Sequence, residues 1–214
     1  RKMGKKVLIC WGLVLVTNLF AQSKDIIVLN SPDIDRGLTV MSALSHRASV
    51  VEFDTTSISH QDMSDLLWAA NGINRPETGK RTAPSAMNAQ DIDVFIFNAT
   101  GVYVYNAQSH ILELVVKGDN RGVFSEDEAD TKPPIICLLV SEMSRFGAGD
   151  NLQKLEWAAI DAGIVAQNIL LFCTSIDMTG RPRSGMNRKL IKELLGLKDS
   201  QLPLLNIPVS YKKK

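Results

Sequence analysis

Apolar residues recur at helical spacing near both ends of the chain, and strand-like apolar runs fill the middle. Helices are predicted at residues 35–47, 59–71, 152–176 and 187–195. The first is expected to start at Asp33 or Asp35. The second is expected to start at Ser59, with Asp62 in place of the usual Glu of a capping box. Apolar and small residues cover most of the third, which is therefore expected to be a central helix.

The apolar runs between these helices predict an antiparallel sheet. Strands are predicted at residues 94–97, 102–105, 111–116, 135–140 and around 204–209. Residues 98–101 are expected to join the first two as a hairpin, and the wholly apolar run at 135–140 to be a central strand. Extended or irregular chain is expected at residues 23–32, 47–54, 73–81 and 177–185. Helices, then strands, then helices again predict an α+β fold rather than alternating βαβ units.

The first 22 residues differ in composition from the rest of the chain. Three lysines precede a short apolar run at residues 7–16, and Ala21 stands before a polar residue. This is the pattern of a secretory signal peptide, and the run is shorter than the roughly 20 residues that span a bilayer. The sequence therefore predicts a leader at residues 1–22 and a single domain at residues 23–214. The mature protein is expected to be exported to the periplasm, without stable membrane insertion.

Charge and motifs exclude several classes of function. Without residues 1–22, which hold four basic residues and no acidic one, 20 basic and 23 acidic residues remain, a net charge of −3. A slightly acidic chain without a basic stripe is not expected to bind nucleic acid. The sequence has no GxGxxG, Walker A or GxSxG motif, and no clustered metal ligands are expected. Cys137 and Cys173 lie in apolar runs and are expected to be buried free thiols.

The stretch at residues 81–90 (RTAPSAMNAQ) is rich in hydrogen-bonding groups and runs into a buried strand. Such a turn commonly places polar groups at the edge of a ligand pocket. Arg47 and Ser49 have the spacing to share one phosphate, although an exposed Arg beside a turn Ser is the simpler interpretation. Trp68 fits either a cap on a flat ligand or a core residue.

Blocks along the chain resemble the motifs of the nitroreductase family of FMN enzymes, in the same order. The matching segments are residues 47–53 (RASVVEF), 66–72 (LLWAANG), 84–90 (PSAMNAQ), 161–171 (DAGIVAQNILL) and 207–211 (IPVSY). The second block is similar to the azoline-oxidase branch of the family. The resemblance covers residues 44–211, nearly the whole predicted mature chain.

The resemblance implies a mainly antiparallel sheet flanked by helices, in an intimate homodimer with FMN at the interface. The small residues at 158, 159, 162, 163 and 166 agree with close helix contact between subunits. By the same resemblance, Arg47 and Ser49 would hold the phosphate or ribityl end of FMN. The turn would contact the flavin, and a loop at residues 178–183 would close over it. The cofactor-binding residues implied are Arg47, Ser49, Arg81, Pro84, Ser85, Asn88, Gln90, Thr179, Gly180 and Arg183.

The implied activity is transfer of a hydride from NAD(P)H through flavin N5 to a nitroaromatic, quinone or similar small acceptor, without a catalytic side chain. Two alternatives stay open: a flavin-dependent oxidase or dehydrogenase acting on a peptide or azoline-like substrate, and a flavin-binding dimer without turnover. Export weighs against use of NAD(P)H. Val51 stands where the family usually has Arg or Lys, so Arg81 or Arg183 would have to supply the missing charge.

Overall fold

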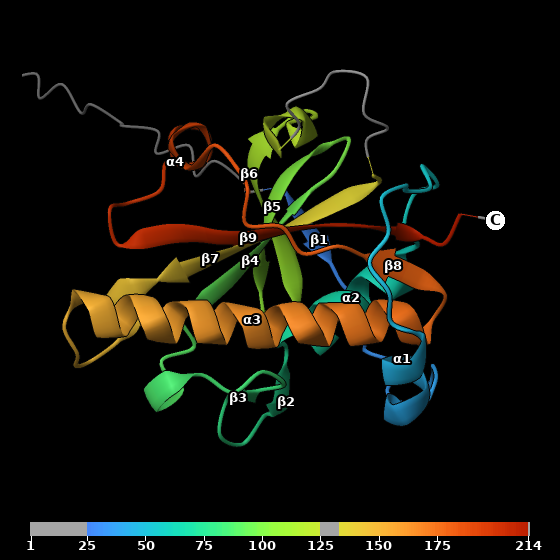
Figure 1. Ribbon diagram of the computed structural model, residues 1–214, viewed down its shortest axis with the longest axis horizontal. Helices are drawn as coiled ribbons and strands as arrows, with labels where there is room; N and C mark the ends of the chain where they lie inside the picture. The colour runs from blue at the N-terminus through green and yellow to red at the C-terminus, as the bar shows by residue number, and fades with distance from the viewer. Residues whose placement is uncertain (1–24, 125–132, 214) are drawn as a thin grey trace, which may run out of the picture.

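The computed structural model describes residues 25–124 and 133–213 as an α+β fold, which confirms the predicted class (Figure 1). The helices are α1 (Val40–His46), α2 (His60–Asn71), α3 (Asn151–Ser175) and α4 (Arg188–Leu195). The strands are β1 (Ile26–Val28), β2 (Ile73–Arg75), β3 (Lys80–Arg81), β4 (Ile92–Phe97), β5 (Gly101–Asn106), β6 (Ile111–Lys117), β7 (Ile135–Glu142), β8 (Met178–Gly180) and β9 (Gln201–Tyr211). The predicted leader lies outside the described residues and stays a prediction.

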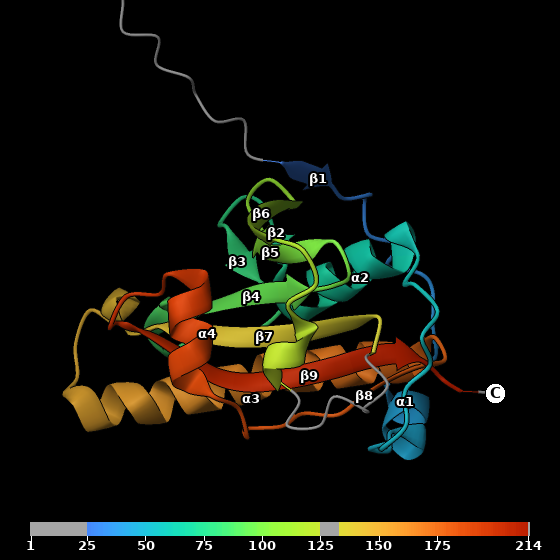
Figure 2. The same ribbon diagram turned by 90° about the horizontal axis from the view of Figure 1, so that it is seen from above.

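A seven-stranded sheet in the order β1-β6-β5-β4-β7-β9-β8 forms the centre of the molecule, and its described pairings are antiparallel. Seen from above, β4, β7 and β9 run side by side (Figure 2). The predicted hairpin is confirmed, because Phe97 pairs with Val102 across residues 98–101. The wholly apolar run at 135–140 is confirmed as a central strand, with neighbours on both sides.

Short pairings account for the errors of the sequence-based prediction. Residues 23–32 were expected to be an exposed lead-in, but Ile26–Val28 pairs with β6. Residues 73–81 were expected to be irregular, but they form the β2–β3 hairpin. The loop expected at Met178–Gly180 is strand β8, paired with β9. Strands of two or three residues are too short to show a period, so only their partners reveal them.

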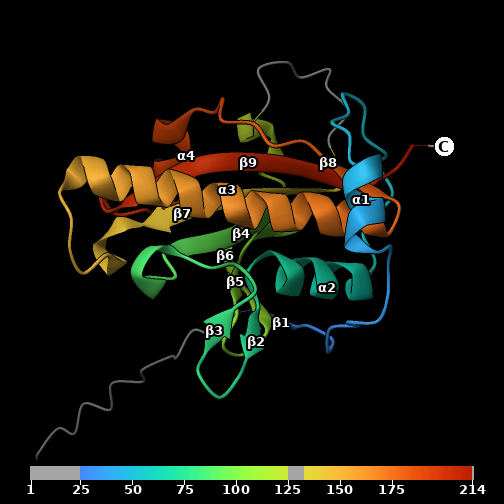
Figure 3. The ribbon, with the colours of Figure 1, turned by 60° about the horizontal axis from the view of Figure 1, so that its bottom comes forward.

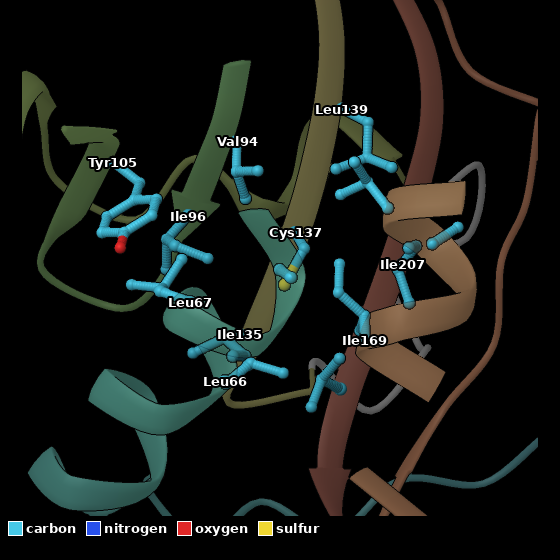
Figure 4. Packing of buried hydrophobic residues seen from close by; sticks show 14 of the residues in the cluster. Leu66, Leu67, Val94, Ile96, Tyr105, Ile135, Cys137, Leu139, Ile169 and Ile207 are labelled. Carbon is cyan, nitrogen blue, oxygen red and sulfur yellow. The ribbon is translucent and has the colours of Figure 1, made fainter. Parts of the chain in front are cut away.

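The two faces of the sheet carry separate apolar layers. Residues Ile135, Cys137 and Leu139 of β7 face α2 and α3, and the alternate residues of β7 face α4. Helices α2 and α3 lie side by side over the first face (Figure 3). Figure 4 shows Leu66 and Ile169 of these helices packed with strand residues such as Cys137. Cys137 and Cys173 are buried free thiols, as predicted.

Helix α3 begins with a complete capping box. The Asp150 carboxylate accepts the Gln153 backbone N–H, and the Gln153 side chain accepts the Asp150 N–H. By length and composition α3 could also cross a membrane, but here it lies against the sheet with half of its apolar window buried. Its alanines at 158, 162 and 166 are buried within the chain. Most of the alanine-rich face predicted to contact another subunit therefore packs inside this one.

Helix α1 starts later than predicted. Its N-cap is Thr39, whose hydroxyl accepts the Ser42 N–H, rather than Asp33 or Asp35. The apolar side chains that predicted this helix are largely exposed: Met41 is 75% exposed and Val40 is 67% exposed. An amphipathic helix with its apolar face in solvent has surface available for a partner. The second helix starts at Ser59 as predicted, and the Ser59 hydroxyl accepts the Asp62 N–H.

Candidate functional site

The predicted site residues fall into two groups along α3. Asp161 of α3 contacts the turn at residues 85–90, and Thr174 borders a hollow that also contains Ser49. These two positions are 13 residues apart in the helix, which corresponds to about 20 Å at 1.5 Å per residue. Figure 1 shows α1 and β8 at the end of α3 that contains Thr174. Within one chain, the turn and the hollow therefore do not meet.

The turn is held by hydrogen bonds to its own backbone and to α3. The Ser85 hydroxyl accepts the Gln90 N–H at 2.8 Å. The Asp161 carboxylate accepts the Ala86 N–H at 2.9 and 3.2 Å. Met87, Asn88 and Gln90 have positive φ angles of 52°, 54° and 49°, a left-handed conformation that is costly for residues other than glycine. Strain of this kind persists only where the surroundings impose it, and it is concentrated at functional sites.

Arg81 stabilises the base of the turn. Its Nε donates to Gln90 Oε1 at 2.9 Å, and its Nη1 donates to the Asn71 carbonyl at 3.1 Å. The Gln90 amide in turn donates to the Gly79 carbonyl. Burial lowers the pKa of the Arg81 guanidinium below its ordinary value, while the charge of Asp93 opposes that shift. In this chain Arg81 and Gln90 are thus bound to each other, whereas Asn88 is exposed.

The second group surrounds a hollow of about 520 Å³. It is lined by His46, Ala48, Ser49, Val50, Val51, Glu52, Thr174, Met178, Thr179, Lys212 and Lys213. Arg47 flanks it and is half-buried. Among the described residues, neither the Arg47 guanidinium nor the Ser49 hydroxyl has a hydrogen-bond or ion-pair partner. A charged guanidinium and a neutral hydroxyl that can both donate hydrogen bonds beside a hollow are suited to binding a phosphate group.

Lys212 and Lys213 were not predicted as site residues. Lys213 forms an ion pair with Glu52 at 2.7 Å, and Lys212 forms one with Asp177 at 3.2 Å. Both pairs are solvent-exposed and therefore weak. The sequence showed these lysines only as a C-terminal tail. Pairing of β8 with β9 brings this tail beside the Ser49 segment, which no sequence signal indicated.

Ser210, in the block at residues 207–211 (IPVSY), has a structural contact. Its side chain is fully buried, and its hydroxyl accepts the Asp54 N–H at 3.1 Å. This bond fastens the extended segment that carries Arg47 and Ser49 to the last strand. The next residue, Tyr211, accepts the Ser59 N–H and donates to Asp62. The block at residues 207–211 therefore joins the start of α2 to the wall of the hollow.

The remaining candidates lie in different surroundings. Thr179 lines the hollow, but Gly180 is buried, and a Cβ there would lie 3.2 Å from Leu170 and 3.4 Å from Ile207. Gly180 therefore allows close packing of β8 on α3. Arg183 bonds through its backbone and its Nε to Asn206 of β9, and it does not line the hollow.

Trp68 lies at a separate hollow of about 420 Å³. Its indole N–H donates to the Ile73 carbonyl at 3.1 Å, and the ring is only partly buried. Tyr105 and His110, which bond to each other at 2.8 Å, line the same hollow. Trp68 does not line the hollow at Ser49, and no residue of the 85–90 turn lines the hollow at Trp68.

The fold is α+β with an antiparallel sheet. The two groups of site residues form a hollow suited to a phosphate and a strained turn rich in hydrogen-bond donors. The sequence profile of the nitroreductase family matches residues 44–211. The chain belongs to the nitroreductase family, whose members are generally flavin-dependent oxidoreductases.

Related proteins agree with that assignment. A protein of Methanocaldococcus jannaschii that carries the nitroreductase name is 25% identical over 198 residues, covering 88% of this chain and 98% of its own. A solved structure from Ralstonia eutropha JMP134, also carrying that name, is 30% identical with a TM-score of 0.84, covering 90% of this chain and 92% of its own. A chain of the E. coli microcin synthetase complex McbBCD is similar in fold, with a TM-score of 0.69 at 18% identity over 95% of this chain and 85% of that one.

Replacing Met87 by glycine tests whether the turn is strained. Met87→Gly is expected to raise the free energy of unfolding by up to about 1 kcal/mol, because glycine adopts a positive φ without steric cost. Ala89, in the same turn, has an ordinary helical φ of −66°. The matched variant Ala89→Gly should lower the free energy of unfolding by about 0.5–1 kcal/mol. Urea denaturation measures both, and equal losses in the two variants would contradict strain at Met87.

Proposed function

We propose that this protein is an FMN-dependent oxidoreductase that takes a hydride from NAD(P)H and passes it to a nitroaromatic, a quinone or a similar acceptor. The observation that carries the proposal is the Arg47 guanidinium and the Ser49 hydroxyl beside the 520 Å³ hollow, which have no hydrogen-bond or ion-pair partner within residues 25–124 and 133–213. When bound, FMN would supply the redox chemistry of the proposed ping-pong reaction, with N5 as its hydride-exchanging atom. The side chains of this protein bind the cofactor, orient it and tune its chemistry.

The hollow fits the phosphate end of FMN in charge and donor type. Arg47 offers a planar fork of donors, and Ser49 adds a hydroxyl. Lys212 and Lys213 stand at the same hollow and can leave their exposed ion pairs to face an anion. Val51, which is 78% exposed, lines the hollow without charge. Lys213 is a nearer candidate for the missing positive charge than Arg81 or Arg183, neither of which lines the hollow of its own chain.

A homodimer would complete the site. The hollow and the turn lie about 20 Å apart along α3, so within one chain they do not form one compact site. Large apolar side chains are exposed nearby: Met41 on α1, Ile160 on α3 (60%) and Met87 in the turn (55%). Burying these side chains between two copies would bring the turn of one subunit toward the hollow of the other. The site we propose is therefore shared between subunits.

Arg47 tests the phosphate contact. The purified protein is expected to be yellow, and Arg47→Ala should weaken FMN binding by about 10- to 100-fold, the loss of one charged hydrogen-bond partner. Arg188→Ala, on α4 at the other face of the sheet, is the matched control and should bind FMN normally. Fluorescence quenching on titration with FMN gives both affinities. A colourless wild-type protein that takes up no added FMN would overturn the proposal.

Stopped-flow measurement of flavin reduction tests whether NADH or NADPH is the hydride donor. Anaerobic mixing of the flavin-loaded protein with NADH or with NADPH is expected to bleach the flavin rapidly with at least one of them. An added quinone should then restore the colour. A flavin that stays oxidised with both donors would leave the peptide or azoline oxidase and the non-catalytic flavin dimer as the remaining functions.

Ile160 tests the shared site. Ile160→Glu places a charge on the exposed face of α3 and is expected to yield a monomer that has lost most of its FMN affinity. Leu190 on α4 is similarly exposed, at 44%, and Leu190→Glu should leave both properties unchanged. Sedimentation equilibrium with parallel FMN titration measures them together. A monomeric Ile160→Glu protein with wild-type FMN affinity would show that one chain suffices.

A further inference from the structure

Two carboxyl groups are buried together beneath the strained turn. Asp91, just before β4, is fully buried, and Asp161 of α3 is 3% exposed. They line one small space with residues of the turn, among them Ser85 and Gln90. The space holds only about 10 Å³, which is at most marginal for a single water. The two acids therefore have to satisfy each other and their immediate neighbours.

Asp161 acts as the acceptor for the turn. Both of its oxygens receive the Ala86 N–H, so its charged form stabilises the start of the left-handed segment. This is the hydrogen bond by which α3 fixes the turn. Any change of charge beside Asp161 acts on the same carboxylate, because little water is present to screen it.

Asp91 lacks a donor on one side. The Ser141 hydroxyl donates to Asp91 Oδ2 at 2.5 Å. Asp91 Oδ1 is the buried side-chain oxygen that receives no hydrogen bond from any described residue. The Asp91 carboxyl interacts with the Asp161 carboxyl across the small space that both residues line. Two carboxylate oxygens in contact repel each other unless one of them carries a proton.

We propose that Asp91 and Asp161 share one proton, and that this proton positions the turn at residues 85–90. With the proton present, Asp91 donates to Asp161, and Asp161 accepts from both Asp91 and the Ala86 N–H. When the proton leaves, two negative charges face each other in a dry space. The Ala86 contact then weakens and the strained turn relaxes. The role in flavin binding rests on the proposed function, but the shared proton itself does not.

The surrounding charged groups do not neutralise the pair. From β3, Arg81 donates to Gln90 and Asn71. From the turn after β7, Arg145 donates to the Gln90 carbonyl and to Asp93. Glu142 accepts from Ser144, although its backbone N–H bonds to the Asp91 carbonyl. Asp161 is thus the charged side chain that faces Asp91.

The shared proton is expected to leave the Asp91–Asp161 pair with a midpoint near neutral pH. Burial, reinforced by contact with Asp161, raises the pKa of Asp91 to about 7, while the Ser141 hydroxyl acts in the opposite direction. In the unfolded chain an aspartate has a pKa of about 3.9. Because the folded-state pKa is the higher one, the associated stability is full below about pH 4. It declines as pH rises toward 7.

The test follows the Ala86 amide in the 15N-labelled full chain between pH 5 and 9, without substrate. A one-proton transition with a midpoint near 7 is expected in the wild type. Asp91→Asn should abolish the transition, because its amide donates to Asp161 at every pH. Asp93→Asn, two residues further along the chain in β4, is the matched control and should keep it. A flat wild-type profile, or the same transition in Asp91→Asn, would overturn the proposal.

A second variant keeps the test decisive if Asp91→Asn does not fold. Ser141→Ala removes the donor that favours the charged form of Asp91, so the Ala86 midpoint should move to higher pH. An unchanged midpoint would reject Asp91 as the titrating group.

Urea denaturation gives an independent measurement. Between about pH 5 and 7, the unfolding constant of the wild type relative to that of Asp91→Asn should rise by roughly tenfold per pH unit. A constant ratio would contradict the shared proton. These readouts need neither flavin nor turnover, so their failure is distinguishable from failure of the proposed oxidoreductase function.

Discussion

Packing of α3 along one face of the sheet is the constraint on which the rest of the structure depends. Small residues at 158, 162 and 166 let this 25-residue helix lie close to the strands and to α2. Once it is placed there, Asp161 reaches the backbone of the turn, and Thr174 borders the hollow. A single rigid helix thus sets the distance between the two groups of site residues. That separation within one chain is the reason why the site we propose is shared between subunits.

The two groups are stabilised by different physical means. The hollow is formed by exposed chain segments fastened at a few points, such as the Ser210 hydroxyl on Asp54. Its charged groups are solvent-exposed, which suits a site that has to admit and hold an anion. The turn is the opposite case, with left-handed residues, a half-buried guanidinium and two buried acids under it. Such a turn is costly to build and correspondingly well defined, and the shared proton makes its position depend on pH.

The sequence indicated the main elements because their patterns are long. The 152–176 periodicity, the apolar run at 135–140 and the Ser59 cap each agree with the structure to within a few residues. It also indicated the candidate residues of both groups, through blocks similar to the nitroreductase motifs. Short strands such as β1 and β8 could not be predicted, because their pairing partners lie far away in the sequence.

By itself, the sequence determined the α+β class, the family and the two polar segments that carry the candidate site, because these depend on local pattern and residue type. Tertiary structure decided how those segments are distributed. It separated Ser49 from the 85–90 turn, brought Lys212 and Lys213 to the hollow, and placed Asp91 against Asp161. Residues 70 positions apart, such as this acid pair, meet only when strand and helix pack. The charge, strain and proton of the site are therefore properties of packing that the linear pattern does not contain.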